Sequence, residues 1–150
     1  MKAIIARIAL GAALVLAAAG PAPAADAMKG GSMMMSACHG VTLSAVGGSG
    51  ESGCAIPRGG NGVIFLAISV KGEPAGASQP SHIHKGKCGS NGPIVIPLKN
   101  VVGGQSANSI PMAKWTTVSH GGYYINVHKS ATALATIVSC GNIMAMPGAM

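Results

Sequence analysis

Glycine and proline interrupt this chain so often that no apolar pattern continues for long enough to form a long helix. The sequence has 23 glycines and 9 prolines, and between them lie short apolar or alternating runs. The clearest run is GVIFLAISVKG (62–72), which is rich in β-branched residues, and VTLSAV (41–46) alternates with the period of a half-buried strand. Such runs, separated by turn residues, are typical of an all-β chain.

Later segments extend this prediction. YYINVH (123–128) and TIVSCGNI (136–143) are expected strands, whereas the prolines of PIVIPL (93–98) favour an edge strand or a loop lying on the sheet. About six to eight short strands, with no internal repeat, predict an antiparallel sandwich or a Greek-key barrel. GGSGESG (47–53) is an expected turn or flexible loop, and EPAGASQP (73–80) is an expected loop. The region 103–117 is mixed, with Trp115 as an expected anchor.

The N-terminal segment predicts export. Lys2 and Arg7 precede a short apolar run and an Ala-Pro-Ala cleavage motif, so residues 1–24 are expected to be a bacterial-type secretory signal peptide. The apolar run is too short to span a bilayer, and no membrane span is expected after cleavage. We therefore predict a periplasmic or secreted protein with a Met-rich flexible tail over 25–37 and one β-sandwich domain over 38–150.

Composition excludes some partners. Hydrophobic residues make up 49% of the chain and charged residues 9%, which favours a folded domain. The net charge is +7, or +5 without Lys2 and Arg7, and the basic residues form no run. We therefore expect no nucleic-acid partner. Lys85 and Lys87 are placed to attract a small anion.

The stretch SHIHKGKCG (81–89) is the strongest candidate for a metal site. In an extended strand, residues i and i+2 share a face, so His82 and His84 are expected to project together. A third imidazole is needed, and the sequence offers His128, His120 and His39. His128 ends an expected strand, whereas His120 precedes two glycines and reaches the same site only if the chain folds back sharply.

A second candidate site lies in the tail. Met33, Met34 and Met35 are consecutive in an otherwise polar segment, and His39 follows shortly after. The methionines are either a strand end or signal-peptide remnant, or a thioether site for Cu(I), since methionine sulfur prefers that ion.

Cysteine usage agrees with export. The sequence has 4 cysteines, an even number that is typical of disulfides in an exported chain. The spacing of Cys38, Cys54, Cys88 and Cys140 alone allows three pairings.

Three separated motifs, HIHKGKCG, NVHKSA and IVSCGNI, together resemble the copper/zinc superoxide dismutase family. The segments SGESG, HIHKG and NGPIV also resemble chordin-type (CHRD) domains. Both resemblances imply an all-β, Greek-key, immunoglobulin-like sandwich or barrel. The dismutase resemblance implies copper ligands at His82, His84 and His128 and a Cys88–Cys140 disulfide. Cys38 is then left to pair with Cys54 or to bind Cu(I) beside His39.

The chain departs from the dismutase pattern after Cys88. The following stretch, GSNGPIVIPLKNVVGGQS, has no His, Asp or Glu, so neither the bridging histidine nor a zinc site is recognised. The guiding arginine before Cys140 is absent as well, and only Lys85, Lys87 or Lys129 could replace its charge.

Three functions remain open from the sequence. The first is an exported copper-binding protein for copper tolerance, storage or delivery to a partner, with Cu(I) or Cu(II) at the three histidines. The second is a copper-only superoxide dismutase, and the third is a metal-free CHRD-like interaction domain. Zinc at the same three histidines is a further alternative, since three histidines and a water also suit that ion.

Overall fold

The computed structural model describes residues 37–145. The predicted signal peptide and nearly all of the predicted Met-rich tail, including Met33, Met34 and Met35, lie outside the described residues. The elements, in chain order, are β1 (Val41–Ala45), β2 (Ser52–Gly60), β3 (Val63–Lys71), β4 (Ser78–Gln79), β5 (Ser81–Lys85), β6 (Ile94–Pro97), β7 (Val101–Val102), β8 (Gln105–Pro111), α1 (Met112–Val118), β9 (Tyr123–His128) and β10 (Ile137–Ile143).

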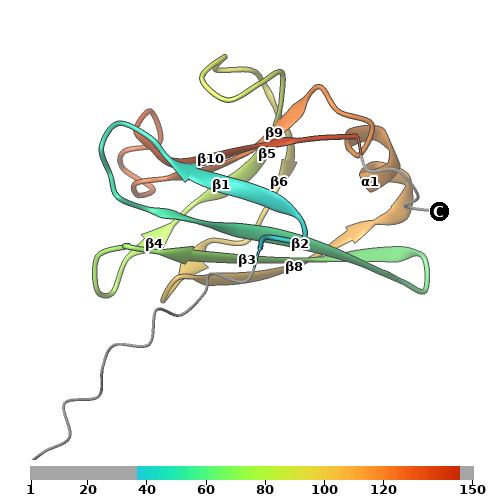
Figure 1. Cartoon of the computed structure of the whole chain (residues 1–150), viewed down its shortest axis with the longest axis horizontal. Coiled ribbons are helices and arrows are strands. Elements are labelled where there is room, and N and C mark those ends of the chain that lie inside the picture. The colour runs from blue at the N-terminus through green and yellow to red at the C-terminus, as the bar shows by residue number, and fades with distance from the viewer. Residues whose placement is uncertain (1–36, 146–150) are drawn as a thin grey trace, which may run out of the picture. The chain divides into compact units, whose positions relative to one another are not determined.

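The strands form one curled antiparallel sheet in the order β4-β7-β8-β3-β2-β1-β10-β9-β5-β6. The first and last of the described strands are therefore neighbours, and Ser44 of β1 lies opposite Cys140 of β10. Figure 1 shows β2, β3 and β8 in one layer and β5, β9 and β10 in the other, with β1 between the two. The predicted all-β sandwich or barrel is confirmed.

Side-chain alternation builds the core between these layers. In β3, Ile64, Leu66, Ile68 and Val70 are buried, and the residues between them are exposed. The opposite layer contributes Ile83 of β5, and other members are Leu43, Ile110, Ile125, Val127 and Ile143. The period of two that predicted the strands also decides which face each strand buries.

Two regions differ from the sequence-based prediction, and the structure resolves the mixed region into two elements. Ser52 and Gly53 begin β2 instead of belonging to a loop, because β2 is paired along its length with the strongly apolar β3. The loop expected over 73–80 contains the two-residue strand β4. Region 103–117 divides into β8 and α1, and the expected anchor, Trp115 of α1, is 2% exposed.

β6 forms one end of the sheet and pairs only with β5. The edge position expected from the prolines of segment 93–98 is therefore confirmed. Proline has no N–H to donate to a ladder, which is why it is tolerated at an edge.

Two disulfides join the described elements. Cys38 pairs with Cys54 of β2, and Cys88, in the loop after β5, pairs with Cys140 of β10. The pairing implied by the dismutase resemblance is confirmed, and Cys38 is not free for a Cu(I) site. Within residues 37–145, no helix is long and apolar enough to cross a membrane.

Candidate metal centre

The ladder between β5 and β9 gives the outer face of this layer its polar character. Ile83 lies opposite Ile125 and points into the core, whereas His82 lies opposite Asn126 and His84 opposite Tyr124. Because side chains alternate along each strand, His128 shares the outer face with Asn126 and Tyr124. The two strands thus bring the three histidines to one face.

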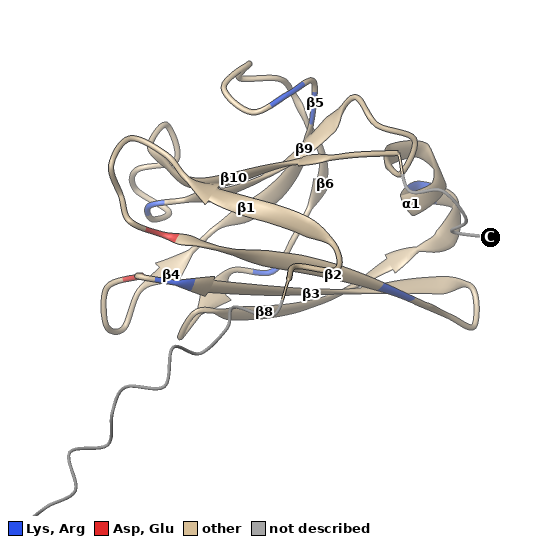
Figure 2. Cartoon of the chain, viewed as in Figure 1, with Lys and Arg blue, Asp and Glu red and all other residues tan. Residues whose placement is uncertain are grey.

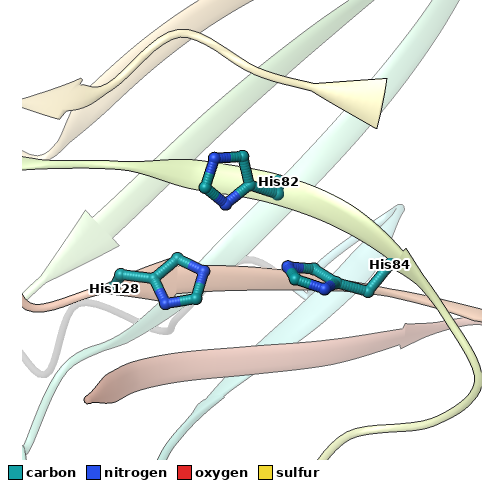
Figure 3. Close-up of side chains that lie close together, drawn as sticks. All are labelled: His82, His84 and His128. Carbon is teal, nitrogen blue, oxygen red and sulfur yellow. The ribbon is translucent and has the colours of Figure 1, made fainter. Parts of the chain in front are cut away.

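The three imidazole rings converge on one another (Figure 3). One ring nitrogen of each histidine lies within 4.8 Å of the others, so the cluster could hold a metal ion. The ring centroids are 5.1 Å apart for His82 and His128, 5.7 Å for His82 and His84, and 5.8 Å for His84 and His128. The grouping predicted from the HxH and NVH motifs is present in the fold.

Backbone carbonyls orient two of the three rings. His84 Nδ1 lies 2.8 Å from the carbonyl oxygen of Gly92, and His128 Nδ1 lies 2.6 Å from that of Leu134. A carbonyl only accepts, so Nδ1 carries the proton in both contacts and Nε2 keeps its lone pair. This arrangement fixes the tautomer and the orientation of each ring, as the outer partners of metal-binding histidines do.

Each histidine of the cluster also has one buried ring nitrogen that makes no hydrogen bond. His82 Nδ1, His84 Nε2 and His128 Nε2 are buried side-chain atoms without a hydrogen bond, as is Oδ1 of the neighbouring Asn126. A buried polar atom without a partner is costly, and such atoms are rare in folded proteins. Three of them in one cluster are explained if they bind a cation.

Burial favours the neutral form of two of the three histidines, because it lowers the pKa of each. It lowers the pKa of His82, and positive charge on His128 or His84 would lower it further. Burial also lowers the pKa of His128, partly offset by the Leu134 carbonyl, which stabilises the charged form. Metal binding requires the neutral imidazole, so both shifts favour the form that can bind.

A cavity of about 410 Å³ opens beside the histidines. Besides the three rings, its lining includes Gly92, Ile94, Asn126 and Leu134. None of the described residues that line it is a lysine, arginine, aspartate or glutamate. The cavity leaves one side of the cluster open to a small molecule and adds no charge.

The other candidate residues lie apart from the cluster. His39 and His120 are exposed, and neither joins the three-histidine group found among the described residues. Lys85, Lys87 and Lys129 are exposed and do not line this cavity. Charged residues are sparse along the described part of the chain, as the colouring of the ribbon in Figure 2 shows.

Three contributors to the site, Gly92, Leu134 and Tyr124, were not predicted from the sequence. Gly92 and Leu134 act through main-chain carbonyls, which carry no residue-specific signal. Alternation along the YYINVH motif predicts that Asn126 shares a face with His128. The same alternation extends to Tyr124, which lies four positions before His128, so the sequence carried a signal for this residue as well.

The donor set limits the chemistry of the site. Three imidazole nitrogens suit zinc, copper or nickel, whereas calcium and magnesium prefer oxygen ligands. Three protein ligands beside an open cavity also leave room for an exchangeable ligand. The arrangement is that of an uncharged nitrogen site accessible from one side.

Comparisons with known proteins agree with one of the two resemblances. A family model described as the CHRD domain matches residues 12–133, which is most of the 150-residue chain. No curated protein and no solved structure matches the chain. Nothing in these comparisons supports membership of the copper/zinc superoxide dismutase family. The matched range contains all three clustered histidines, and the chain belongs to the CHRD domain family.

Proposed function

We propose that this chain is an exported copper-binding protein that holds one copper ion at His82, His84 and His128 for copper tolerance, storage or delivery. The observation that carries the proposal is the set of three buried imidazole nitrogens without partners, within one cluster. The two disulfides support export, because disulfides persist in oxidising compartments.

The donor chemistry supports copper over other ions. Among divalent first-row metals, a nitrogen site generally binds Cu²⁺ most tightly, and imidazole is a good ligand for copper. Three neutral donors also suit the low coordination number of Cu(I). The same ligands would hold Cu(II) with a solvent molecule added from the cavity. The expected ligand atoms are Nδ1 of His82 and Nε2 of His84 and His128, because these atoms are buried and unpartnered.

The test is a copper titration of the disulfide-oxidised protein against competing chelators, with zinc titrated in parallel. We expect one copper per chain, held more tightly than zinc. His128→Ala should weaken copper binding by more than about 100-fold, the upper end of the cost of disturbing a ligand's outer partner. His120→Ala is the matched control, because His120 is exposed and outside the cluster. Failure of the oxidised protein to compete for copper would overturn the proposal.

A copper-only superoxide dismutase is the second candidate, and the open cavity is the observation that favours it. Dismutation requires access for a small anion, and the cavity provides a path. The lining has no charged side chain that would add to the attraction of a bound copper ion for an anion. The cluster contains no fourth histidine among the described residues. Superoxide decay should be measured on the same copper-loaded samples, and fast decay that disappears in His128→Ala would favour the enzyme.

A metal-free interaction domain is the third candidate, in line with the CHRD family. It predicts that His82, His84 and His128 bind no metal tightly. The titration therefore separates it from both copper functions.

A further inference from the structure

Tyr124 is a buried, ionisable side chain in contact with one of the clustered histidines. It belongs to β9 and is fully buried. In the ladder it lies opposite His84, and the two rings stack with centroids 5.2 Å apart and an angle of 22° between their planes. The phenol ring therefore covers one face of the His84 imidazole.

The hydroxyl group of Tyr124 reaches the residue that orients His84. The N–H of Gly92 donates to Tyr124 Oη at 2.9 Å, and the carbonyl of Gly92 accepts from His84 Nδ1 at 2.8 Å. Tyr124 thus contacts His84 directly through its ring and indirectly through Gly92. The three residues form a closed ring of contacts.

Gly92 is held in place from a second side. The N–H of Lys85 donates to the carbonyl of Pro93 at 3.0 Å, which ties the returning loop to the end of β5. A Cβ atom at Gly92 would overlap the carbonyl oxygen of Lys85, so the backbone can approach this closely only with glycine. The position of the Gly92 carbonyl therefore depends on β5 and on the Tyr124 hydroxyl together.

From these contacts we infer that Tyr124 is a positioning residue for the metal ligand His84, an inference that rests on the proposed copper site. Its ring sets the plane of the imidazole. Its hydroxyl accepts from the N–H of Gly92 and so fixes the position of the Gly92 carbonyl. That carbonyl keeps the proton of His84 on Nδ1, and the lone pair of His84 Nε2 then faces the other two histidines.

The test is Tyr124→Phe, which keeps the stacked ring and removes only the hydroxyl. In the metal-free protein at mildly alkaline pH, the side-chain nitrogen NMR spectrum should show His84 as a single tautomer protonated at Nδ1. In Tyr124→Phe we expect a mixture of tautomers. Copper affinity should fall by up to about 10-fold, the lower end of the effect of losing an outer partner of a ligand, because the Gly92 carbonyl is displaced and not removed. The Cu(II) electron paramagnetic resonance spectrum should change as well.

Tyr123→Phe is the matched control. Tyr123 is the neighbouring residue in β9 and packs against the hydrophobic core. This variant should leave the His84 tautomer and copper affinity unchanged even if it lowers stability, which separates positioning from a general effect on folding.

An unchanged tautomer and unchanged copper affinity in folded Tyr124→Phe would overturn the inference. If the wild-type protein binds no copper, the proposed function fails, and the tautomer measurement still decides the role of Tyr124 on its own. A variant that shifts the tautomer without metal supports the positioning role.

Discussion

Cys88 and Cys140 form a disulfide that joins the loop after β5 to β10, with β9 lying between those two strands in the sheet. The N–H of Cys88 also donates to Asn142 Oδ1 of β10 at 2.8 Å. The loop between β5 and β6 is thereby fastened over the face that carries Tyr124 and His128. The same loop contains Gly92, whose carbonyl orients His84.

Removing this disulfide should therefore weaken copper binding as well as stability. The double variant Cys88→Ser with Cys140→Ser should lose roughly 4 kcal/mol of unfolding free energy in the chain-entropy model, given a sequence separation of 52. Copper affinity should fall because the Gly92 carbonyl loses its fixed position. Denaturant unfolding and chelator competition measure the two effects.

The disulfide between Cys38 and Cys54 is the control, because it closes a shorter loop, with a separation of 16, on strand β2. Its removal should cost roughly 3 kcal/mol of unfolding free energy and leave copper affinity unchanged. Equal losses of affinity in the two double variants would contradict the role given to the loop.

The metal-free protein should lose stability on acidification. Burial lowers the pKa of His82 and His128 from an ordinary value of 6.5, so below that pH the unfolded chain binds protons that the folded chain does not. The free energy of unfolding then decreases as the pH falls below about 6.5, and the contribution is flat above it. Thermal unfolding between about pH 7 and about pH 5 measures this slope.

Substitution of one histidine should reduce the pH dependence. His128→Gln removes one of the two shifted groups, so its unfolding midpoint should change less over the same pH range. His120→Gln, at an exposed position, should follow the wild type. A wild-type midpoint that stays constant or rises on acidification would disagree with the buried, neutral histidines.

Gly92→Ala should damage the centre more than most glycine substitutions. A methyl group at this position would overlap the Lys85 carbonyl oxygen, so the loop must move and take the Gly92 carbonyl away from His84. We expect at least about 10-fold weaker copper binding, comparable to the loss of an outer partner. Gly60→Ala is the control, since a Cβ there meets only an ordinary contact with the Phe65 ring. Similar affinities for the two variants would contradict the prediction.

Deletion of residues 25–36 should leave the three-histidine centre intact. One copper ion per chain should bind with unchanged affinity, because His82, His84 and His128 all come from β5 and β9. If Met33, Met34 and Met35 capture Cu(I) with His39, the full-length chain should bind extra Cu(I) that the deletion variant does not. Titration with Cu(I) under anaerobic conditions measures the stoichiometry, and loss of the tight site on deletion would be the contrary result.

Strands with a strong pattern could be predicted from the sequence. β3 alternates apolar and less buried residues, and β9 and β10 coincide with the expected segments to within one residue. β2 was not predicted, because its sequence, SGCAIPRGG, has a glycine and proline content typical of loops. Its pairing with β3 and β1 outweighs that local preference.

Strand alternation also made part of the candidate site predictable. Alternation places His82 and His84 on one face whatever strand lies beside them, so the pair follows from spacing alone. The choice of His128 over His120 as the third ligand depended on the family resemblance. His128 lies near His82 and His84 because β5 pairs with β9, and the spacing of residues alone does not predict that pairing. The carbonyls of Gly92 and Leu134 were beyond prediction, because loop conformation decides where a main-chain oxygen lies.

The edge position of β6 has a consequence for solubility. Ile94 and Val95 of β6 are 53% and 39% exposed, and an exposed apolar edge strand is a template for pairing with a second molecule. Pro93 precedes this strand and Pro97 ends it, and neither can donate to a new ladder. The two prolines therefore oppose edge-to-edge pairing of two molecules at the strand that lies beside the three-histidine cluster.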